Sequence, residues 1–189
     1  MKLSNKIGFV ATAKNQIALV LKSVGNVEMS PSKSFAPVND ISFIIADKAH
    51  KKAIKQFYKQ QHYSASFMGD DFCVLALSQE KVIAAALCSG IIVNANQYFL
   101  HGVVVDRHYQ HRGIASKLIN QCWQHLINLT QRKQANASLV CFAESDLLPL
   151  YQANDFKVVC VDSIDNHLKS RYLAYNKKHK QLKILHRCN

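Results

Sequence analysis

The stretch FLHGVVVDRHYQHRGIASKLI, residues 99–119, decides the fold of this chain. It begins with the β-branched and aromatic residues typical of a strand, crosses a basic turn that contains Gly113, and continues with helical periodicity. The apolar positions of that continuation share one face of an amphipathic helix: Ile114, Leu118, Ile119, Cys122, Trp123, Leu126 and Ile127. The pattern predicts a strand that runs directly into a helix, with His101 inside an otherwise apolar strand.

The turn before this helix has the composition of an anion site. The first N–H groups of a helix have no partner within the helix, and the helix dipole adds partial positive charge there. Gly113 lets a ligand approach the backbone closely, Ala115 keeps the next turn narrow, and Ser116 offers a hydroxyl. Cationic or titratable side chains surround the turn: Arg107, His108, His111 and Arg112. The chain lacks both GxxxxGK[ST] and GxGxxG, which excludes a Walker and a Rossmann loop; a plain strand-to-helix connection is the alternative.

The remaining sequence predicts the order β-α-β-β-β-α-β-α-β-β. This is an α/β (α+β) fold with a mixed, mostly antiparallel sheet flanked by helices. Strands are expected over residues 41–47, in a hairpin over 72–92 that turns at 79–81, and over 98–105, 138–143, 156–162 and 171–177. Helices are expected over residues 48–63, capped by Asp47, from Ile114 onward, and over 146–155.

Composition shifts divide the chain into three parts. Residues 1–39 are interpreted as an N-terminal extension and linker, because a Pro- and Ser-containing stretch follows two apolar runs. Those runs favour a hairpin, with a helix as the alternative. The main domain is expected over residues 40–176, and residues 177–189 are expected to form a basic C-terminal tail.

Composition is that of a globular protein. Of the 189 residues, 49% are hydrophobic and 19% charged, and no apolar stretch reaches the roughly 18–20 residues of a membrane span. Six scattered cysteines without CxxC or zinc-like spacing indicate free thiols in a reducing cytoplasm, with no metal site. The net charge of +12 is concentrated in residues 165–189, 48–59 and 1–39. Such a basic surface is compatible with nucleic acid, an anionic membrane, a polyphosphate cofactor or plain solvation, and no nucleic-acid-binding motif supports the first.

The segment VVVDRHYQHRGIASKLI resembles the coenzyme A motif of the GCN5-related N-acetyltransferase (GNAT) superfamily, Q/R-x-x-G-x-G/A after a strand. The resemblance implies a GNAT fold over residues 40–176 and acetyl-CoA as co-substrate, without a metal. It further implies that the pyrophosphate lies on the N–H groups of the turn, while the pantetheine arm pairs with the preceding strand. The cofactor-binding residues implied in this way are Val103, Val104, Val105, Gln110, His111, Arg112, Gly113, Ile114, Ala115 and Ser116.

Two more residues match positions with catalytic roles in that superfamily. The segment DLLPLYQANDF resembles its second motif, with Tyr151 as the residue that protonates the departing CoA thiolate. With FLHGVVVDRHYQHRG it is most similar to the aralkylamine N-acetyltransferase branch, which implies that His101 draws the proton from the amine. A packing role for Tyr151 and a histidine bonded within the sheet are the alternatives. The chain departs from the family pattern at Phe99, Glu144 and Asp155, which replace a histidine, an asparagine and a glycine.

We therefore expect an N-acetyltransferase that transfers acetyl to a primary amine by direct attack in a ternary complex. His101 is the expected general base and Tyr151 the general acid, and the N–H of Val104 or a neighbouring strand residue polarises the thioester. One alternative acceptor is a protein N-terminus, a lysine, or an aminoacyl or RNA-associated group. A further alternative is a non-catalytic module on the same fold that binds CoA or nucleic acid. The expected partner is a small-molecule or peptide amine, with no membrane partner, and the sequence leaves a nucleic-acid partner and a homodimer open.

Overall fold

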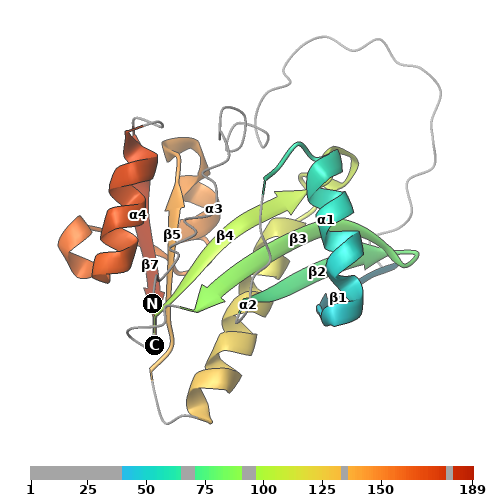
Figure 1. Ribbon diagram of the computed structural model, residues 1–189, viewed down its shortest axis with the longest axis horizontal. Coiled ribbons are helices and arrows are strands. Elements are labelled where there is room, and N and C mark those ends of the chain that lie inside the picture. Colours follow the sequence, from blue (N-terminus) through green and yellow to red (C-terminus); the bar gives the residue numbers. More distant parts are fainter. Residues whose placement is uncertain (1–39, 65–70, 91–96, 133–135, 178–180) are drawn as a thin grey trace, which may run out of the picture.

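The structure is a computed structural model that describes residues 40–64, 71–90, 97–132, 136–177 and 181–189 (Figure 1). The extension and linker expected over residues 1–39 lie outside the described residues, as do residues 91 and 92 at the end of the expected hairpin. Within the described ranges, no helix is both long enough and apolar enough to cross a membrane.

The described residues form a seven-stranded sheet in the order β1-β2-β3-β4-β5-β7-β6. The parallel pair is β4 with β5, and every other neighbouring pair is antiparallel. The expectation of a mixed, mostly antiparallel sheet is confirmed. Its strands are β1 (Ile41–Ile45), β2 (Phe72–Ser78), β3 (Lys81–Gly90), β4 (Gln97–Val105), β5 (Ser138–Ala143), β6 (Lys157–Val159) and β7 (Lys183–Cys188).

Helices cover both faces of the sheet (Figure 1). They are α1 (Lys51–Gln60), α2 (Ile114–Gln131), α3 (Leu148–Gln152) and α4 (Asn166–Asn176). Successive residues of a strand point to opposite faces of the sheet, so neighbouring residues of β4 show which helices lie on which face. Leu100 belongs to the core cluster of α2 and α3, whereas its neighbour Phe99 packs with Leu168 of α4. Likewise, Leu87 of β3 packs with α1, and its neighbour Ala86 packs in the α2 cluster. Helices α1 and α4 therefore share one face, and α2 and α3 the other.

Local sequence signals account for the regular parts of the fold. Gln79 and Glu80 between β2 and β3 have φ angles of 48° and 62°, as a two-residue hairpin turn requires. The Asp47 carboxylate accepts hydrogen bonds from the N–H groups of Ala49 and His50, so it caps the 3₁₀ turn that leads into α1. The predicted hairpin and the predicted cap are both confirmed.

The prediction for the C-terminal part of the chain is wrong in one element. Residues 171–177 are not a strand, because most of them belong to α4, which starts behind the capping carboxylate of Asp165. Leu168 and Tyr172 then lie one helical turn apart and pack on the same cluster, a spacing that a strand would not give. The last strand is β7, which pairs with both β5 and β6. Residues 183–188, assigned to a basic tail, are thus part of the sheet.

The six cysteines are unpaired thiols. Cys73, Cys88, Cys122 and Cys141 are buried in the core, and burial raises the pKa of Cys73 to about 12. Because thiolates are the reactive form, these buried cysteines act as small apolar side chains. The prediction of free thiols is confirmed.

Candidate active site

Strands β4 and β5 are paired only where they begin. Residues 97–99 of β4 pair with residues 138–140 of β5, whereas the rest of β5 pairs with β7 alone. From Leu100 to its end, β4 therefore has no strand partner on its β5 side among the described residues. An open edge of this kind presents backbone N–H and C=O groups with which an extended ligand can pair.

A β-bulge in β4 lies beside this opening. Leu87 pairs with His101 and Ala85 with Val104, so one residue of β3 faces both Gly102 and Val103. Gly102 has a φ of +60°, which favours glycine. A Cβ there would also lie 3.1 Å from the Tyr58 hydroxyl and 3.3 Å from the Tyr63 ring. Since a bulge bends its strand and increases its twist, the bulge is where β4 leaves the plane it shares with β5.

The backbone of β4 beyond the bulge has a defined orientation. The N–H of Asp106 donates to the carbonyl of Ile83 over 2.8 Å, so Asp106 faces β3. Backbone groups of successive strand residues point to alternate edges, which turns Val104 toward β3 and Val103 and Val105 toward the open edge. Consistent with this, the Val105 carbonyl accepts a hydrogen bond from the Gln110 side chain over 3.0 Å.

The turn after β4 leaves the N-terminus of α2 uncapped by any side chain. Gly113 is its N-cap residue, with a φ of 73° and no side-chain cap hydrogen bond. A Cβ at Gly113 would meet no atom within 4 Å, so the space in front of the turn is open. His111 also has a positive φ, of 60°, and its side chain is exposed. Uncapped N–H groups, open space and basic side chains fit the pyrophosphate of a CoA-type ligand.

The other predicted cofactor-binding residues have distinct surroundings. The Ile114 side chain is buried in the core, so only its backbone can meet a ligand. Ala115 and Ser116 are half-buried in the first turn of α2, and the Ser116 hydroxyl accepts a hydrogen bond from Asn154 over 3.0 Å. The Arg112 guanidinium lies 5.4 Å from the centre of the Tyr109 ring, a cation–π contact that holds it at the turn. The turn residues predicted from the motif are thus brought together in space.

His101 lies on the face of the sheet that α1 and α4 cover. Its Nε2 is 2.9 Å from the Ser89 hydroxyl, and its ring stacks on Phe99 with 5.5 Å between ring centres. Burial, and then the positive charge of Arg171, lower the pKa of His101 to about 4. This pKa is below the ordinary histidine value of about 6.5, so the imidazole is neutral at pH 7.

Tyr151 lies on α3 and is 6% exposed. Its ring meets that of Phe156 edge to face, with 5.5 Å between ring centres. Among the described residues, no group forms a hydrogen bond with its hydroxyl, and the ring packs in the core that α2 and α3 share. Burial, with smaller effects from Cys141 and then Tyr63, holds the pKa of Tyr151 well above its ordinary value, so the phenol keeps its proton at neutral pH. Asp155, after this helix, adopts the left-handed geometry with a φ of 63°, as expected for a residue that replaces glycine.

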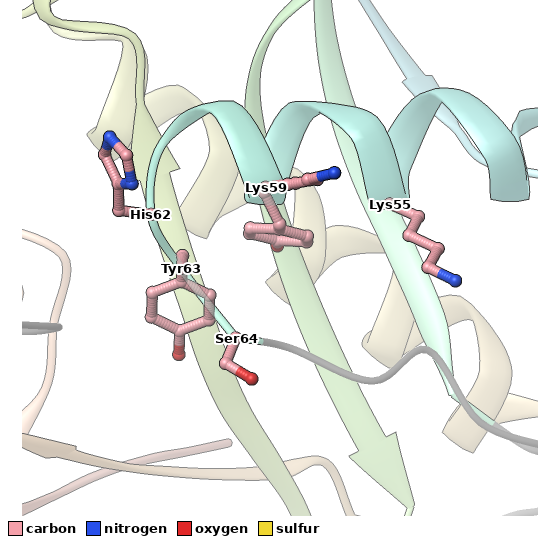
Figure 2. A pocket seen from close by; sticks show the side chains of 6 residues that line it. Lys55, Lys59, His62, Tyr63 and Ser64 are labelled. Carbon is pink, nitrogen blue, oxygen red and sulfur yellow. The ribbon is translucent and has the colours of Figure 1, made fainter. Parts of the chain in front are cut away.

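A pocket of about 370 Å³ lies along the end of α1 (Figure 2). It is lined by Lys55, Tyr58, Lys59, His62, Tyr63 and Ser64. The Tyr58 hydroxyl donates a hydrogen bond to the Gly102 carbonyl over 2.7 Å, which places this pocket beside the bulge of β4. Sequence reasoning missed the two tyrosines, although Tyr58 lies four residues after Ile54 on the apolar face of α1. It also missed Gly102, whose position inside a strand pattern is a signal for a bulge.

Asn154 is the other polar residue of the site that sequence reasoning missed. It is 2% exposed, donates to the Ser116 hydroxyl and the Leu150 carbonyl, and accepts from Asn120 over 2.8 Å. These bonds tie the first turns of α2 to α3 and thereby join the two helices that carry the turn and Tyr151. A buried asparagine in a short turn has no sequence signal that separates it from a surface residue.

Comparisons with known proteins identify the architecture. A family model described as "Acetyltransferase (GNAT) family" matches residues 42–147. N-acetylglutamate synthase from Neisseria gonorrhoeae, solved with coenzyme A and N-acetyl-glutamate, aligns with a TM-score of 0.57 at 12% identity over 83% of this chain. The match covers 36% of that protein, so this chain spans just over a third of its length. Comparison with curated protein sequences finds no match.

Two smaller proteins align over nearly their whole length. Escherichia coli ElaA has a TM-score of 0.53 at 12% identity, over 78% of this chain and 99% of that one. An acyl-CoA N-acyltransferase from Pseudomonas aeruginosa has a TM-score of 0.52 at 13% identity, with the same coverage. At such identities the likeness shows the fold alone, and that fold is the one that the motif at residues 103–116 implied.

Proposed function

The chain belongs to the acetyltransferase (GNAT) family, and from this premise we propose that it transfers an acetyl group from acetyl-CoA to a primary amine. The observation that carries the proposal is the continuity of the open edge of β4 with the uncapped N-terminus of α2. An extended thioester arm and a pyrophosphate need these two features in this order, because the arm pairs with a strand edge and the phosphates with helix N–H groups. That a neighbouring structure contains coenzyme A supports this co-substrate.

The proposed reaction needs one proton acceptor and one proton donor. The amine nitrogen attacks the thioester carbonyl, a C–N bond forms, the C–S bond breaks, and the amine proton leaves as the sulfur gains one. His101 is the proposed acceptor: in the tautomer whose Nε2–H donates to the Ser89 hydroxyl, Nδ1 keeps a free lone pair. Tyr151 is the proposed donor to the sulfur, because its phenol is protonated at neutral pH. The N–H of Val103 or Val105, rather than of Val104, polarises the thioester carbonyl, since these face the open edge.

A base with a pKa of about 4 limits how the amine is activated. It removes protons from a neutral amine during attack but does not deprotonate an ammonium ion to a large extent. We therefore propose that the enzyme binds the neutral amine, or that the ammonium loses its proton to water before attack. His101 then accepts the second proton as the C–N bond forms, directly or through a water molecule.

The acceptor is the finer part of the proposal. The match of His101 and Tyr151 to the aralkylamine branch supports their roles, and a small amine is the first candidate. A protein N-terminus, a lysine, or an aminoacyl or RNA-associated group is the second, for which the basic surface is the supporting feature. A cytoplasmic location is part of the same proposal, because the unpaired thiols suit a reducing compartment.

A coupled assay tests the function directly. Acetyl-CoA is incubated with the protein and a panel of amines, amino acids and peptides, and free CoA thiol is measured. Amine-dependent CoA release is the expected result. Tight acetyl-CoA binding without release for any amine would instead assign the chain to the non-catalytic alternative.

A further inference from the structure

Basic side chains from two elements far apart in the sequence lie on the face of the sheet that carries His101. Lys55 and Lys59 lie on successive turns of α1 and line the pocket, with Tyr63 and Ser64 on the segment that follows the helix (Figure 2). Arg171 comes from α4, on the same face of the sheet. Its guanidinium lies 5.0 Å from the centre of the Phe99 ring, on which His101 stacks.

Contacts join the pocket to the candidate base. Tyr58 lines the pocket and hydrogen-bonds the carbonyl of Gly102, the residue directly after His101. Tyr63, the next aromatic of the lining, packs on Tyr58 with 5.2 Å between ring centres. Burial, and to a smaller extent Tyr175 of α4, raise the pKa of Tyr63 to about 12. The pocket is therefore next to the position from which an amine would meet His101.

These cations have no acidic counterpart in the described part of the chain. The ion pairs there are His50–Asp47, Lys169–Asp162 and Arg187–Asp155, none of which involves Lys55, Lys59 or Arg171. None of the described residues that line the pocket is a carboxylate, and α1 contains four lysines and no acidic residue. Like charges on one concave surface repel a cationic ligand and attract an anionic one.

We propose that this basic pocket and Arg171 bind an anionic group of the acceptor, so that the substrates are small amines that carry a carboxylate or a phosphate. The inference rests on the acetyl transfer proposed above and specifies its acceptor. Carboxylates and phosphates share the chemistry that lysine and arginine recognise, namely a compact anion with several acceptor oxygens. A neutral arylalkylamine has no group that would use these cations.

The charge of Arg171 also connects anion binding to the chemistry. Arg171 is the second cause, after burial, of the low pKa of His101. An acceptor anion beside the guanidinium would offset that charge, and the imidazole would become a stronger base when the correct substrate is bound. A cationic amine at the same position would have the opposite effect.

The test compares acceptors that differ only in charge. Phenylalanine is compared with phenylalaninamide and phenethylamine, and phosphoethanolamine with ethanolamine, by the kcat/KM of CoA release. The kcat/KM of the anionic member of a series should exceed that of its neutral analogue by about tenfold, because a few partly screened charges have an effect of this size. The carboxylate and phosphate arms identify which anion is preferred, and either preference supports the proposal. Equal or better use of the neutral analogues overturns it, whereas no CoA release with any amine overturns the proposed acetyl transfer itself.

Variants of the two pocket lysines test whether these cations cause the preference for anionic acceptors. The double variant Lys55→Gln, Lys59→Gln should raise KM for the anionic acceptor about tenfold, because each lost cation contributes a factor of about two to five. Its KM for the neutral analogue should not change. Lys52→Gln on the same helix is the matched control, because it removes one exposed charge outside the pocket lining. Equal effects of the double variant on both acceptors, or an effect of the same size in the control, would overturn the assignment.

Discussion

The hydroxyl of Tyr58 donates a hydrogen bond to the carbonyl oxygen of Gly102 over 2.7 Å. This bond joins α1 to the bulge of β4, one residue from His101. Both groups are buried, and a Cβ on Gly102 would lie only 3.1 Å from the tyrosine oxygen. The helix that lines the acceptor pocket and the strand that carries the candidate base are therefore fixed to each other by a direct contact.

Tyr58→Phe should weaken this connection. The substitution leaves the Gly102 carbonyl without its partner in a buried site, which costs about 1–3 kcal/mol. The free energy of unfolding, measured by urea titration, should fall by that amount, and kcat/KM for the acceptor should fall with it. Lys52→Gln, which changes the exposed surface of the same helix, is the control. A Tyr58→Phe protein with unaltered stability would show that the bond is not formed in solution.

Gly113→Leu should abolish tight acetyl-CoA binding. The side chain would fill the open space in front of the α2 N-terminus and keep the pyrophosphate from the N–H groups. Because a hydrogen bond to a charged group contributes about 1.5–3 kcal/mol, the loss of one such bond weakens binding by about tenfold or more. Titration calorimetry with acetyl-CoA measures the change.

Gly113→Ala separates bulk from backbone strain in that experiment. Any residue with a Cβ is strained at a φ of 73°, at a cost of about 1–2 kcal/mol of stability. The alanine variant carries this strain with little bulk, so it should lose stability but retain more affinity than the leucine variant. Equal affinity of the leucine variant and the wild type would remove the turn from the binding site.

Arg171→Gln should raise the pKa of His101. Removal of a nearby positive charge favours the protonated imidazole, while burial still opposes it, so the new pKa should lie between about 4 and the ordinary 6.5. The chemical shift of the His101 ring proton, followed by NMR from pH 3 to 8, gives both values. Lys169→Gln on the same helix is the control, since Lys169 pairs with Asp162 instead. An unchanged His101 pKa would show that Arg171 does not act on the candidate base.

His101→Ala and Tyr151→Phe should separate the two proton transfers. Loss of general acid–base catalysis lowers the rate by about 10²-fold or more, and each variant should lose kcat rather than acetyl-CoA affinity. The wild-type kcat/KM should show no acid limb near pH 6.5 from His101, because the folded pKa is about 4 and the imidazole is neutral above it. The acid limb of the profile should instead follow the pKa of the amine. His101→Ala should recover part of its activity at high pH, where hydroxide can accept the second amine proton in place of the imidazole; an identical pH profile in the variant and the wild type would exclude His101.

The sequence predicts most of the fold because its signals are local. The hairpin turn at Gln79 and Glu80, the Asp47 cap and the apolar face of α2 each depend on neighbouring residues, and the structure confirms all three. The last strand could not be predicted in the same way. Residues 183–188 become a strand through pairing with β5 and β6, whereas residues 171–177 contain strand-forming aromatics that pack better on a helix.

In the candidate site too, the sequence predicts the features that depend on neighbouring residues and not those that depend on contacts between distant residues. The turn at Gln110 to Ser116 is continuous in the sequence, so its motif is sufficient to predict it. The pKa of His101 depends on its burial and on Arg171, seventy positions later. The acceptor pocket depends on a contact between Tyr58 and Gly102, forty-four positions apart. Neither relationship is visible before the chain folds.

Transfer of a labelled acetyl group to the amine is the decisive measurement. Acetyl-CoA with an isotopically labelled acetyl group is incubated with the wild-type protein and an amine, and the amine is analysed by mass spectrometry. We expect labelled N-acetyl amine to form in the same amount as the released CoA, and Gly113→Leu to form much less of it under the same conditions. CoA release without label in any amine, or equal transfer by the variant, would contradict it.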